Sequence, residues 1–184
     1  MLFKWVDYCE KYEAEIESWT GDESIRRFVT DDGMKEEHQY YMSQAEWTHN
    51  KNYFCKVILE NSAVIAVIIV LATEGYPVAV NPIIVNPSLR NKGYCTKIIG
   101  ELIHNASEIM GFERAIFEAG IDIDNKPSIK AFENSGFVLA GIHKSGDFTY
   151  WTYPASELEN YRKYSIDSFE KAGYGGKFIV ASEL

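Results

Sequence analysis

The stretch from Val85 to Ile99, VNPSLRNKGYCTKII, passes from an apolar run into a loop and then into a helical pattern. The loop carries Arg90, Lys92 and Gly93, and apolar residues follow at helical spacing. A helix N-terminus favours anions because its N–H groups lack partners, and glycine lets a ligand approach the backbone closely. We interpret the loop as a cradle for phosphate oxygens, with an ordinary solvated loop as the alternative.

The segments before this loop predict strands. Residues 53–60 and 63–72 are rich in β-formers and are separated by Asn61-Ser62, a plausible hairpin turn. A third strand is predicted over residues 77–85, after a turn at Glu74-Gly75. Because Pro82 cannot donate a backbone hydrogen bond, we expect a bulge or an open edge near it.

The segments after the loop alternate between helix and strand. Apolar spacing predicts a helix over residues 95–110 that ends at Gly111, and a strand over residues 114–121. Asp124 to Pro127 begins a second helix that stops at Gly136, and residues 137–143 and 148–153 form a last hairpin. This order predicts a mixed α/β sheet in a three-layer domain.

The two ends of the chain carry weaker patterns. Residues 8–29 predict a helical pair, with Tyr8, Tyr12, Ile16 and Trp19 on one face, and residues 30–52 a covering segment that shapes a substrate site. The Tyr-rich tail, residues 155–184, is expected to dock on the body or on a second copy, which would make a homodimer.

Composition narrows the class of protein. The 184 residues suit one core, and 18 Lys and Arg against 27 Asp and Glu give a net charge of -9, which argues against nucleic acid as the main partner. A cationic substrate fits this charge, although acidity for solubility alone is the commoner explanation.

No metal site, disulfide framework or membrane segment is expected. The cysteines, Cys9, Cys55 and Cys95, lack a CxxC pair, and none of the histidines has a partner at metal-ligand spacing. The longest apolar run, residues 63–72, is much shorter than the roughly 20 residues of a membrane helix. We therefore expect a cytoplasmic protein without a membrane partner.

A second motif lies downstream of the loop, where NKPSIKAFENSGF places Asn125, Ser128, Phe132, Gly136 and Phe137 at fixed spacings. Together with the loop, this motif resembles the GNAT family of N-acetyltransferases. The family has a strand ending in Val-x-Pro, a loop [QR]-x-x-G-x-[GA], and later N-x-x-[SA]-x-x-x-[YF]-x-x-x-G-F. The resemblance covers residues 53–153.

The resemblance implies a GNAT-like three-layer domain over residues 1–154, with a mixed antiparallel and parallel central sheet flanked by helices, and a C-terminal extension over 155–184. It also implies acetyl-CoA as cosubstrate without a metal. Ile83, Ile84 and Val85 would pair with the pantetheine arm, and the loop amides would hold the pyrophosphate. The cofactor-binding residues implied are Ile83, Ile84, Val85, Arg90, Asn91, Lys92, Gly93, Tyr94, Cys95, Thr96, Asn125, Ser128 and Phe132.

Two residues depart from the family pattern. Cys95 takes the place of a Gly or Ala and is interpreted as a small apolar residue, with a reactive thiol as the alternative. Phe132 replaces a tyrosine that would protonate the departing thiolate, and phenylalanine carries no such proton. Asn125 has an alternative reading as a helix cap.

The expected reaction is transfer of an acetyl group to the primary amine of a small cationic molecule or peptide. Such an amine must first lose a proton, and Glu118 on the strand before Asn125 is the candidate base, where relatives that modify protein N-termini have a glutamate. Tyr150 is the candidate acid. A solvent-facing Glu118 and a purely packing Tyr150 are the alternatives. A weak or inactive acyl-CoA-binding regulatory module is the alternative function.

Overall fold

One mixed sheet organises the molecule. The computed structural model describes residues 1–21, 23–28, 35–36, 38–40, 53–72, 77–111, 116–171 and 178–181. Within these ranges the sheet has eight strands in the order β1-β2-β3-β4-β5-β7-β6-β8, and only β4 and β5 run parallel. The strands are β1 Lys4–Asp7, β2 Tyr53–Glu60, β3 Ala63–Ala72, β4 Val78–Val85, β5 Phe117–Asp122, β6 Val138–His143, β7 Phe148–Tyr153 and β8 Phe178–Val180.

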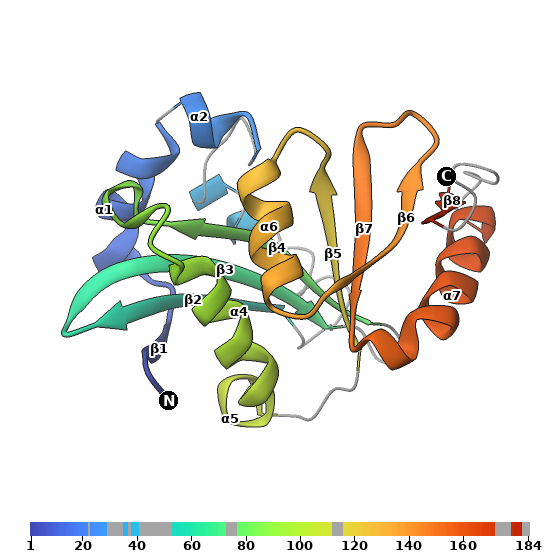
Figure 1. The fold of residues 1–184 in the computed structure, drawn as a ribbon. Coiled ribbons are helices and arrows are strands. Elements are labelled where there is room, and N and C mark those ends of the chain that lie inside the picture. The colour runs from blue at the N-terminus through green and yellow to red at the C-terminus, as the bar shows by residue number, and fades with distance from the viewer. Residues whose placement is uncertain are drawn as a thin grey trace.

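Helices cover both faces of this sheet, so the expected three-layer α/β fold is confirmed (Figure 1). The helices are α1 Glu10–Thr20, α2 Glu23–Arg26, α4 Tyr94–His104, α5 Ala106–Met110, α6 Lys126–Asn134 and α7 Leu158–Lys171, with short 3-10 turns at Pro87–Leu89 and Ala155–Glu157. One core cluster joins α4, α5 and α6 to one face, and a second joins α1 and α2 to the other. Successive residues of a strand pack into opposite clusters, because their side chains point to opposite faces of the sheet.

The β2–β3 hairpin forms as the sequence predicts. Asn61 and Ser62 both adopt positive φ, 50° and 69°, which is the conformation of a two-residue type I′ turn. The flanking strands end and begin on either side of this pair.

The predicted disruption at Pro82 is confirmed. On β4, Val80 lies opposite Val70 and Ile83 lies opposite Ile68, so two β4 residues face Ile69 alone. This is a β-bulge, and it bends β4 away from a regular ladder.

The parallel ladder between β4 and β5 is short. Val78 pairs with Phe117 and Ala79 with Glu118, and no further pair joins these strands within the described ranges. Beyond these pairs the two strands diverge, which leaves the edges of β4 and β5 facing each other across a split (Figure 1).

The helix predicted over residues 95–110 is interrupted. It consists of α4 and α5, separated at Asn105, where φ is -121°. The Asn105 backbone N–H and its side-chain amide both donate to the Glu101 carbonyl, at 2.9 and 3.0 Å. Gly111 ends the pair with φ of 78°, as predicted.

The tail docks on the body of the same chain. Strand β8 pairs with β6, and the apolar side of α7 packs on the outer part of the sheet, where Tyr161 and Phe178 bury against Ala140. Ala140 lies at a bulge in β6, and its carbonyl accepts a hydrogen bond from Arg162 Nε at 3.1 Å. The tail therefore covers the β6–β8 side of the sheet (Figure 1).

A buried carboxylate fastens the N-terminal segment to α4. Glu101 is 7% exposed and accepts from the backbone N–H groups of Leu2 and Phe3 and from the Trp5 indole, at 2.9, 3.2 and 3.1 Å. These three donors satisfy a charged group that would otherwise be costly to bury.

Several expectations fall on residues that lie outside the described ranges. They are the turn at Glu74-Gly75, the start of the strand predicted from residue 114, and most of the covering segment 30–52. The expected helical pair within residues 8–29 corresponds to α1 and α2.

Candidate functional site

A cavity of about 950 Å³ passes through the split between β4 and β5. On one side it is lined by the start of α4 and by α6, and on the other by Ile25 and Phe28 at α2. Its lining contains every cofactor residue expected from the sequence except Lys92, whose Nζ lies 2.9 Å from the Ser88 carbonyl.

The cradle at the mouth of the cavity is built by backbone conformation. Asn91 and Gly93 adopt positive φ, 61° and 76°. The first backbone bond of α4 runs from the Lys97 N–H to the Gly93 carbonyl at 3.1 Å, so the N–H groups of residues 94–96 have no partner within the helix. Alternating left-handed residues followed by free helix amides form an anion-binding nest.

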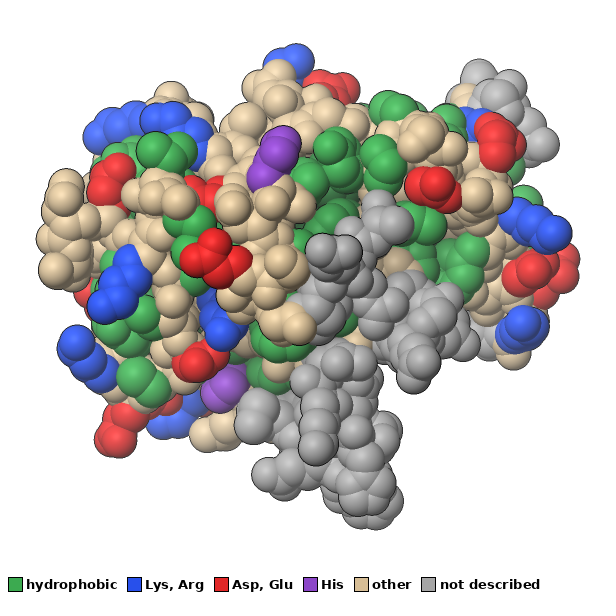
Figure 2. Space-filling model, turned by 90° about the horizontal axis from the view of Figure 1, so that it is seen from below, with side chains coloured by type: hydrophobic (Ala, Val, Ile, Leu, Met, Phe, Trp, Pro, Cys, Tyr) green, Lys and Arg blue, Asp and Glu red, His purple; other side chains and the backbone are tan. Residues whose placement is uncertain are grey.

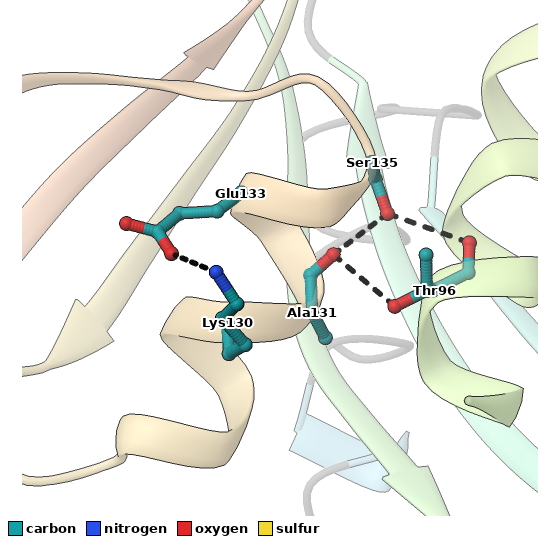
Figure 3. Close-up of polar contacts among 5 residues, drawn as sticks. All are labelled: Thr96, Lys130, Ala131, Glu133 and Ser135. Atoms are coloured by element: carbon teal, nitrogen blue, oxygen red, sulfur yellow. Dashed lines mark hydrogen bonds and ion pairs between the residues drawn. The ribbon is translucent and has the colours of Figure 1, made fainter. Parts of the chain in front are cut away.

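Small polar side chains hold the two helices beside the cavity together (Figure 3). Thr96 Oγ1 donates to the Ala131 carbonyl at 3.5 Å, and Ser135 Oγ donates to the same carbonyl at 2.8 Å and to the Thr96 carbonyl at 3.4 Å. The Thr96 hydroxyl thus fixes α6 against α4, while its backbone N–H remains part of the cradle.

Asn125 caps α6. Its side-chain oxygen accepts from the Ser128 N–H at 3.3 Å, as the alternative reading from sequence anticipated. Both residues also line the cavity. Because the cap uses only the amide oxygen, the amide NH₂ remains available as a donor.

The Cys95 thiol is held in its protonated form. Burial raises the pKa of Cys95 to about 12, so thiolate is scarce at neutral pH. Cys95, in the first turn of α4, packs against the core cluster that α4 and α6 share with the sheet. This environment fits the small apolar residue favoured from the sequence.

Phe132 belongs to the floor of the cavity and to the core. Its side chain is 2% exposed and meets Phe137 edge-on, with ring centroids 4.9 Å apart. Its ring supplies packing at the place where the family pattern has a tyrosine.

Glu118 lies where the split between β4 and β5 closes. It forms the last pair of the β4–β5 ladder, opposite Ala79, and lies opposite Thr152 of β7 on its other side. Phe117, Ala119 and Ile121 face the core with α4 and α6, so Glu118 points to the opposite face. Burial raises the pKa of this carboxyl, and a hydrogen bond from Tyr161 partly offsets the rise.

Tyr150 is brought to the same face as Glu118. Its ring lies 3.7 Å from the position that a Cβ on Gly120 would take, between Glu118 and the open end of β5. Burial, and then the Glu118 carboxylate, raise the pKa of the Tyr150 hydroxyl, which therefore stays protonated at neutral pH. Neither Glu118 nor Tyr150 lines the cavity itself.

Sequence reasoning did not identify Tyr161 or the Arg27–Asp124 ion pair. Arg27 follows α2 and Asp124 precedes α6, and their side chains form an exposed ion pair at 2.6 Å. Tyr161 belongs to α7, whose apolar residues Leu158, Tyr161 and Phe169 recur at helical spacing, a signal present in the tail.

The described part of the chain contains no cluster of His, Cys, Asp or Glu able to hold a metal ion. Among the described helices, none is long and apolar enough to cross a bilayer. Acidic and basic side chains are intermixed over the described part of the face seen in Figure 2.

Comparison with known sequences identifies the family. Residues 8–138 match the family described as the acetyltransferase (GNAT) domain. This chain belongs to the GNAT acetyltransferases. The match includes the split, the cradle and Glu118, and ends before β7, so α7 and β8 lie outside it. A search among curated proteins gave no significant sequence match.

Solved GNAT structures share the fold. The spermidine N-acetyltransferase of Vibrio cholerae, in complex with CoA and spermine, has a TM-score of 0.64 at 12% identity, over 86% of this chain and 99% of that one. The aminoglycoside acetyltransferase AAC(6')-Ib, in complex with coenzyme A and kanamycin, gives 0.61 at 16% identity, over 87% and 99%. Campylobacter jejuni N-acetyltransferase PseH with acetyl coenzyme A gives 0.60 at 16% identity, over 84% and 99%.

Proposed function

We propose that this GNAT acetyltransferase moves an acetyl group from acetyl-CoA to the primary amine of a small cationic molecule or peptide. The observation that carries the proposal is the arrangement of the split. A backbone anion cradle opens at one end of the cavity, and the partly buried carboxylate of Glu118 lies where β4 and β5 meet.

The residues present fit coenzyme A. The nest at Asn91 and Gly93 would hold the pyrophosphate, with Arg90 beside it on the cavity wall. The free edge of β4 at Ile83 to Val85 offers backbone groups to a pantetheine amide, and the Asn125 NH₂ offers a further donor. When bound, the cosubstrate supplies an acetyl thioester.

Glu118 would act as the general base. An alkyl amine with a pKa near 10.4 is only about one part in 10³ neutral at pH 7, a deficit of roughly 4 to 5 kcal/mol. A carboxylate whose pKa is raised by burial is a stronger base than an exposed one and can take the ammonium proton. It lies on the face of the sheet opposite α4 and α6, so the amine would reach it from that face.

Tyr150 is the proposed acid. Its raised pKa keeps the phenol protonated, and its position beside Gly120 sets it along the same face as the base. Phe132 cannot serve in this role, because its side chain carries no ionisable proton.

Two observations support a cationic acceptor: the net charge of this chain and the ligands bound to structurally similar enzymes. The chain has a net charge of -9, and structurally similar acetyltransferases were solved with spermine and with kanamycin. A negative field around the site would concentrate such amines. Polyamines, aminoglycosides and peptide amines are therefore the acceptors to test.

The decisive experiment combines binding with turnover. Calorimetry should show binding of acetyl-CoA, and an amine panel with acetyl-CoA should release free thiol for at least one cationic amine. Gly93→Asp provides the control, because a carboxylate at the cradle should abolish cofactor binding by charge repulsion. Acetyl-CoA binding equal to that of Gly93→Asp, or a panel without thiol release, would contradict the proposal.

A further inference from the structure

Strand β5 presents three residues to the face of the sheet on which Glu118 lies. Side chains alternate along a strand, and every second residue of β5 is buried in the core with α4 and α6. The residues between them are Glu118, Gly120 and Asp122, of which the two acids are partly buried and the glycine is exposed. A glycine therefore lies between two carboxylates on the face opposite α4 and α6.

Gly120 leaves open space between these carboxylates. Apart from its chain neighbours, the only described atoms within 4 Å of the position that a Cβ on Gly120 would take are two ring carbons of Tyr150, the nearer at 3.7 Å. Tyr150 is the cross-strand partner of Gly120 on β7, so its ring forms a wall beside the glycine. Gly120 also lines the cavity between β4 and β5. We call this surface the β5 trough, with Glu118 at one end, Gly120 as its floor and Asp122 at the other end.

Apolar side chains line the cavity next to the trough. Ile25 and Phe28 line it at α2, and Phe148, which lies opposite Asp122 on β7, lines it although 45% of its surface is exposed. An aliphatic chain in the trough would bury its methylene groups against such side chains. Aromatic rings near a carboxylate also favour an ammonium group, because the face of a ring attracts cations.

Asp122 is the only carboxylate among the described residues that line the cavity. Two cations of the lining, Arg27 and Lys130, have acidic partners in Asp124 and Glu133, at 2.6 and 3.3 Å. The third lies beside the cradle, where the phosphates of the cofactor would bind. None of the ion pairs formed by the described residues involves Asp122, so its charge is available to a ligand.

The two oxygens of Asp122 differ in their partners. Oδ1 accepts from the Asp124 backbone N–H at 2.7 Å, and this bond forms the turn that leads from β5 to α6. A carboxylate can accept several hydrogen bonds, so Oδ2 can still accept one from a ligand in the cavity. An ammonium group supplies both the donors and the charge that suit this oxygen.

The length of the trough sets the separation of two amines that could bind along it. Glu118 and Asp122 lie four residues apart on an extended strand, which places their Cα atoms about 13 Å apart. A linear diamine with eight methylene groups separates its nitrogens by nine bonds, about 11 Å in the extended form at about 1.2 Å per bond. One nitrogen of such a molecule can reach Glu118 while the other lies at Asp122.

We propose that Asp122 binds a second ammonium group of the acceptor, so that the enzyme prefers linear amines with two positive charges separated by the length of the β5 trough. Asp122 is then a specificity-determining residue that takes no part in the chemistry. The inference rests on the proposed function, in which the first amine loses its proton to Glu118 and is acetylated. It narrows the acceptors from cationic amines in general to extended diamines and polyamines.

The first test compares three amines with the wild-type enzyme. They are 1,8-diaminooctane, octylamine, which lacks only the second amine, and 1,4-diaminobutane, which is too short to reach both carboxylates. From thiol release, kcat/KM should be about 10- to 100-fold higher for 1,8-diaminooctane than for either of the others, as expected for one hydrogen bond between charged groups. Equal kcat/KM for 1,8-diaminooctane and octylamine would overturn the proposal.

The second test changes the residue. In Asp122→Asn the amide oxygen can still accept from the Asp124 backbone N–H, so the turn is retained while the charge is lost. The ratio of kcat/KM for 1,8-diaminooctane to that for octylamine should fall by about 10- to 100-fold. Asp167→Asn removes the same charge from an exposed position on α7 and should keep the wild-type ratio. An unchanged ratio in Asp122→Asn, or an equal fall in Asp167→Asn, would contradict the role of Asp122.

The two proposals fail in different ways. Thiol release that is independent of the second ammonium group would overturn the role of Asp122 and leave the proposed function intact. Binding of acetyl-CoA without thiol release from any amine of the panel would overturn the proposed function, and with it the acceptor preference.

Discussion

At the scale of single residues, Glu118 combines two conflicting requirements. To act as the proposed base it must be ionised, yet its surroundings favour the neutral acid because burial strips the carboxylate of water. The Tyr161 bond reduces this penalty without cancelling it. A residue with such a conflict should trade stability for activity, because the charged form is retained at an energetic cost.

Glu118→Gln tests this trade. The amide cannot take a proton, so kcat should fall by about 10² to 10⁴-fold in a thiol-release assay. Glu108→Gln, an exposed change on α5, should keep wild-type activity. Equal activity of the two variants would remove Glu118 from the base role.

The same variant should show the opposite effect on stability. The folded pKa of Glu118 lies above its ordinary value of 4.5, so folding favours the protonated form. The contribution of Glu118 is fully present below the unfolded pKa and is lost as pH rises through the folded pKa. The free energy of unfolding of Glu118→Gln, relative to wild type, should therefore rise from pH 4 to pH 8 in urea titrations, and a flat difference would contradict the assignment.

The Cys95 thiol should react slowly with alkylating agents. Because burial raises its pKa to about 12, alkylation by iodoacetamide at pH 7.5 should be much slower than that of the exposed Cys9. Cys95→Ala should retain acetyl-CoA affinity. Mass spectrometry of a time course would show the order of modification, and faster labelling of Cys95 would contradict it.

At the scale of elements, the start of α4 is specified by backbone conformation. Gly93 has φ of 76° and open space where a Cβ would lie, so the cost of a side chain there is conformational. Gly100, within the same helix, also has open space around it but ordinary helical geometry. The two glycines should therefore respond oppositely to the same substitution.

Gly93→Ala should lower the free energy of unfolding by about 1 kcal/mol and weaken acetyl-CoA binding, because the left-handed conformation is strained for alanine. Gly100→Ala should raise the free energy of unfolding by up to about 1 kcal/mol, because alanine favours the helix. Urea unfolding and calorimetry of both variants check this pair, and effects of the same sign would refute the conformational explanation.

The elements predicted well are those whose signals are local. The β2–β3 hairpin follows from Asn61-Ser62, and the bulge in β4 follows from the missing N–H of Pro82. The break at Asn105 was missed, because apolar spacing continues through it and only the backbone conformation there, with φ of -121°, reveals it. The docking of β8 on β6 was left open, because strand pairing depends on partners far apart in sequence.

The residues of the candidate site divide in the same way, between those with local signals and those that depend on contacts distant in sequence. The cradle could be predicted from one loop, since its chemistry comes from consecutive backbone groups. Glu118 could be proposed from its position relative to Asn125, but its partner Tyr161 lies on another helix and carries no motif. Contacts that bring three separate elements together are visible only after folding.

At the scale of the whole molecule, Glu101 joins the first residues to the central helix. Glu101→Ala would leave the Leu2 and Phe3 N–H groups and the Trp5 indole without their acceptor, which should cost about 2 to 4 kcal/mol of unfolding free energy. Glu108→Ala, on the exposed side of α5, should change it by less than about 0.5 kcal/mol. Chemical denaturation compares the two, and similar losses would show that Glu101 is dispensable.

The short contact between β4 and β5 has a mechanical consequence. Among the described residues, the plate formed by strands β1 to β4 and the plate formed by strands β5 to β8 share two paired positions, between β4 and β5, whereas β5 and β7 share six. A load that separates the plates would meet its least resistance at this seam. A ligand that binds along this seam and contacts both plates would stabilise the pairing between them. Its binding should therefore slow hydrogen exchange at the backbone amides of Val78 and Ala79.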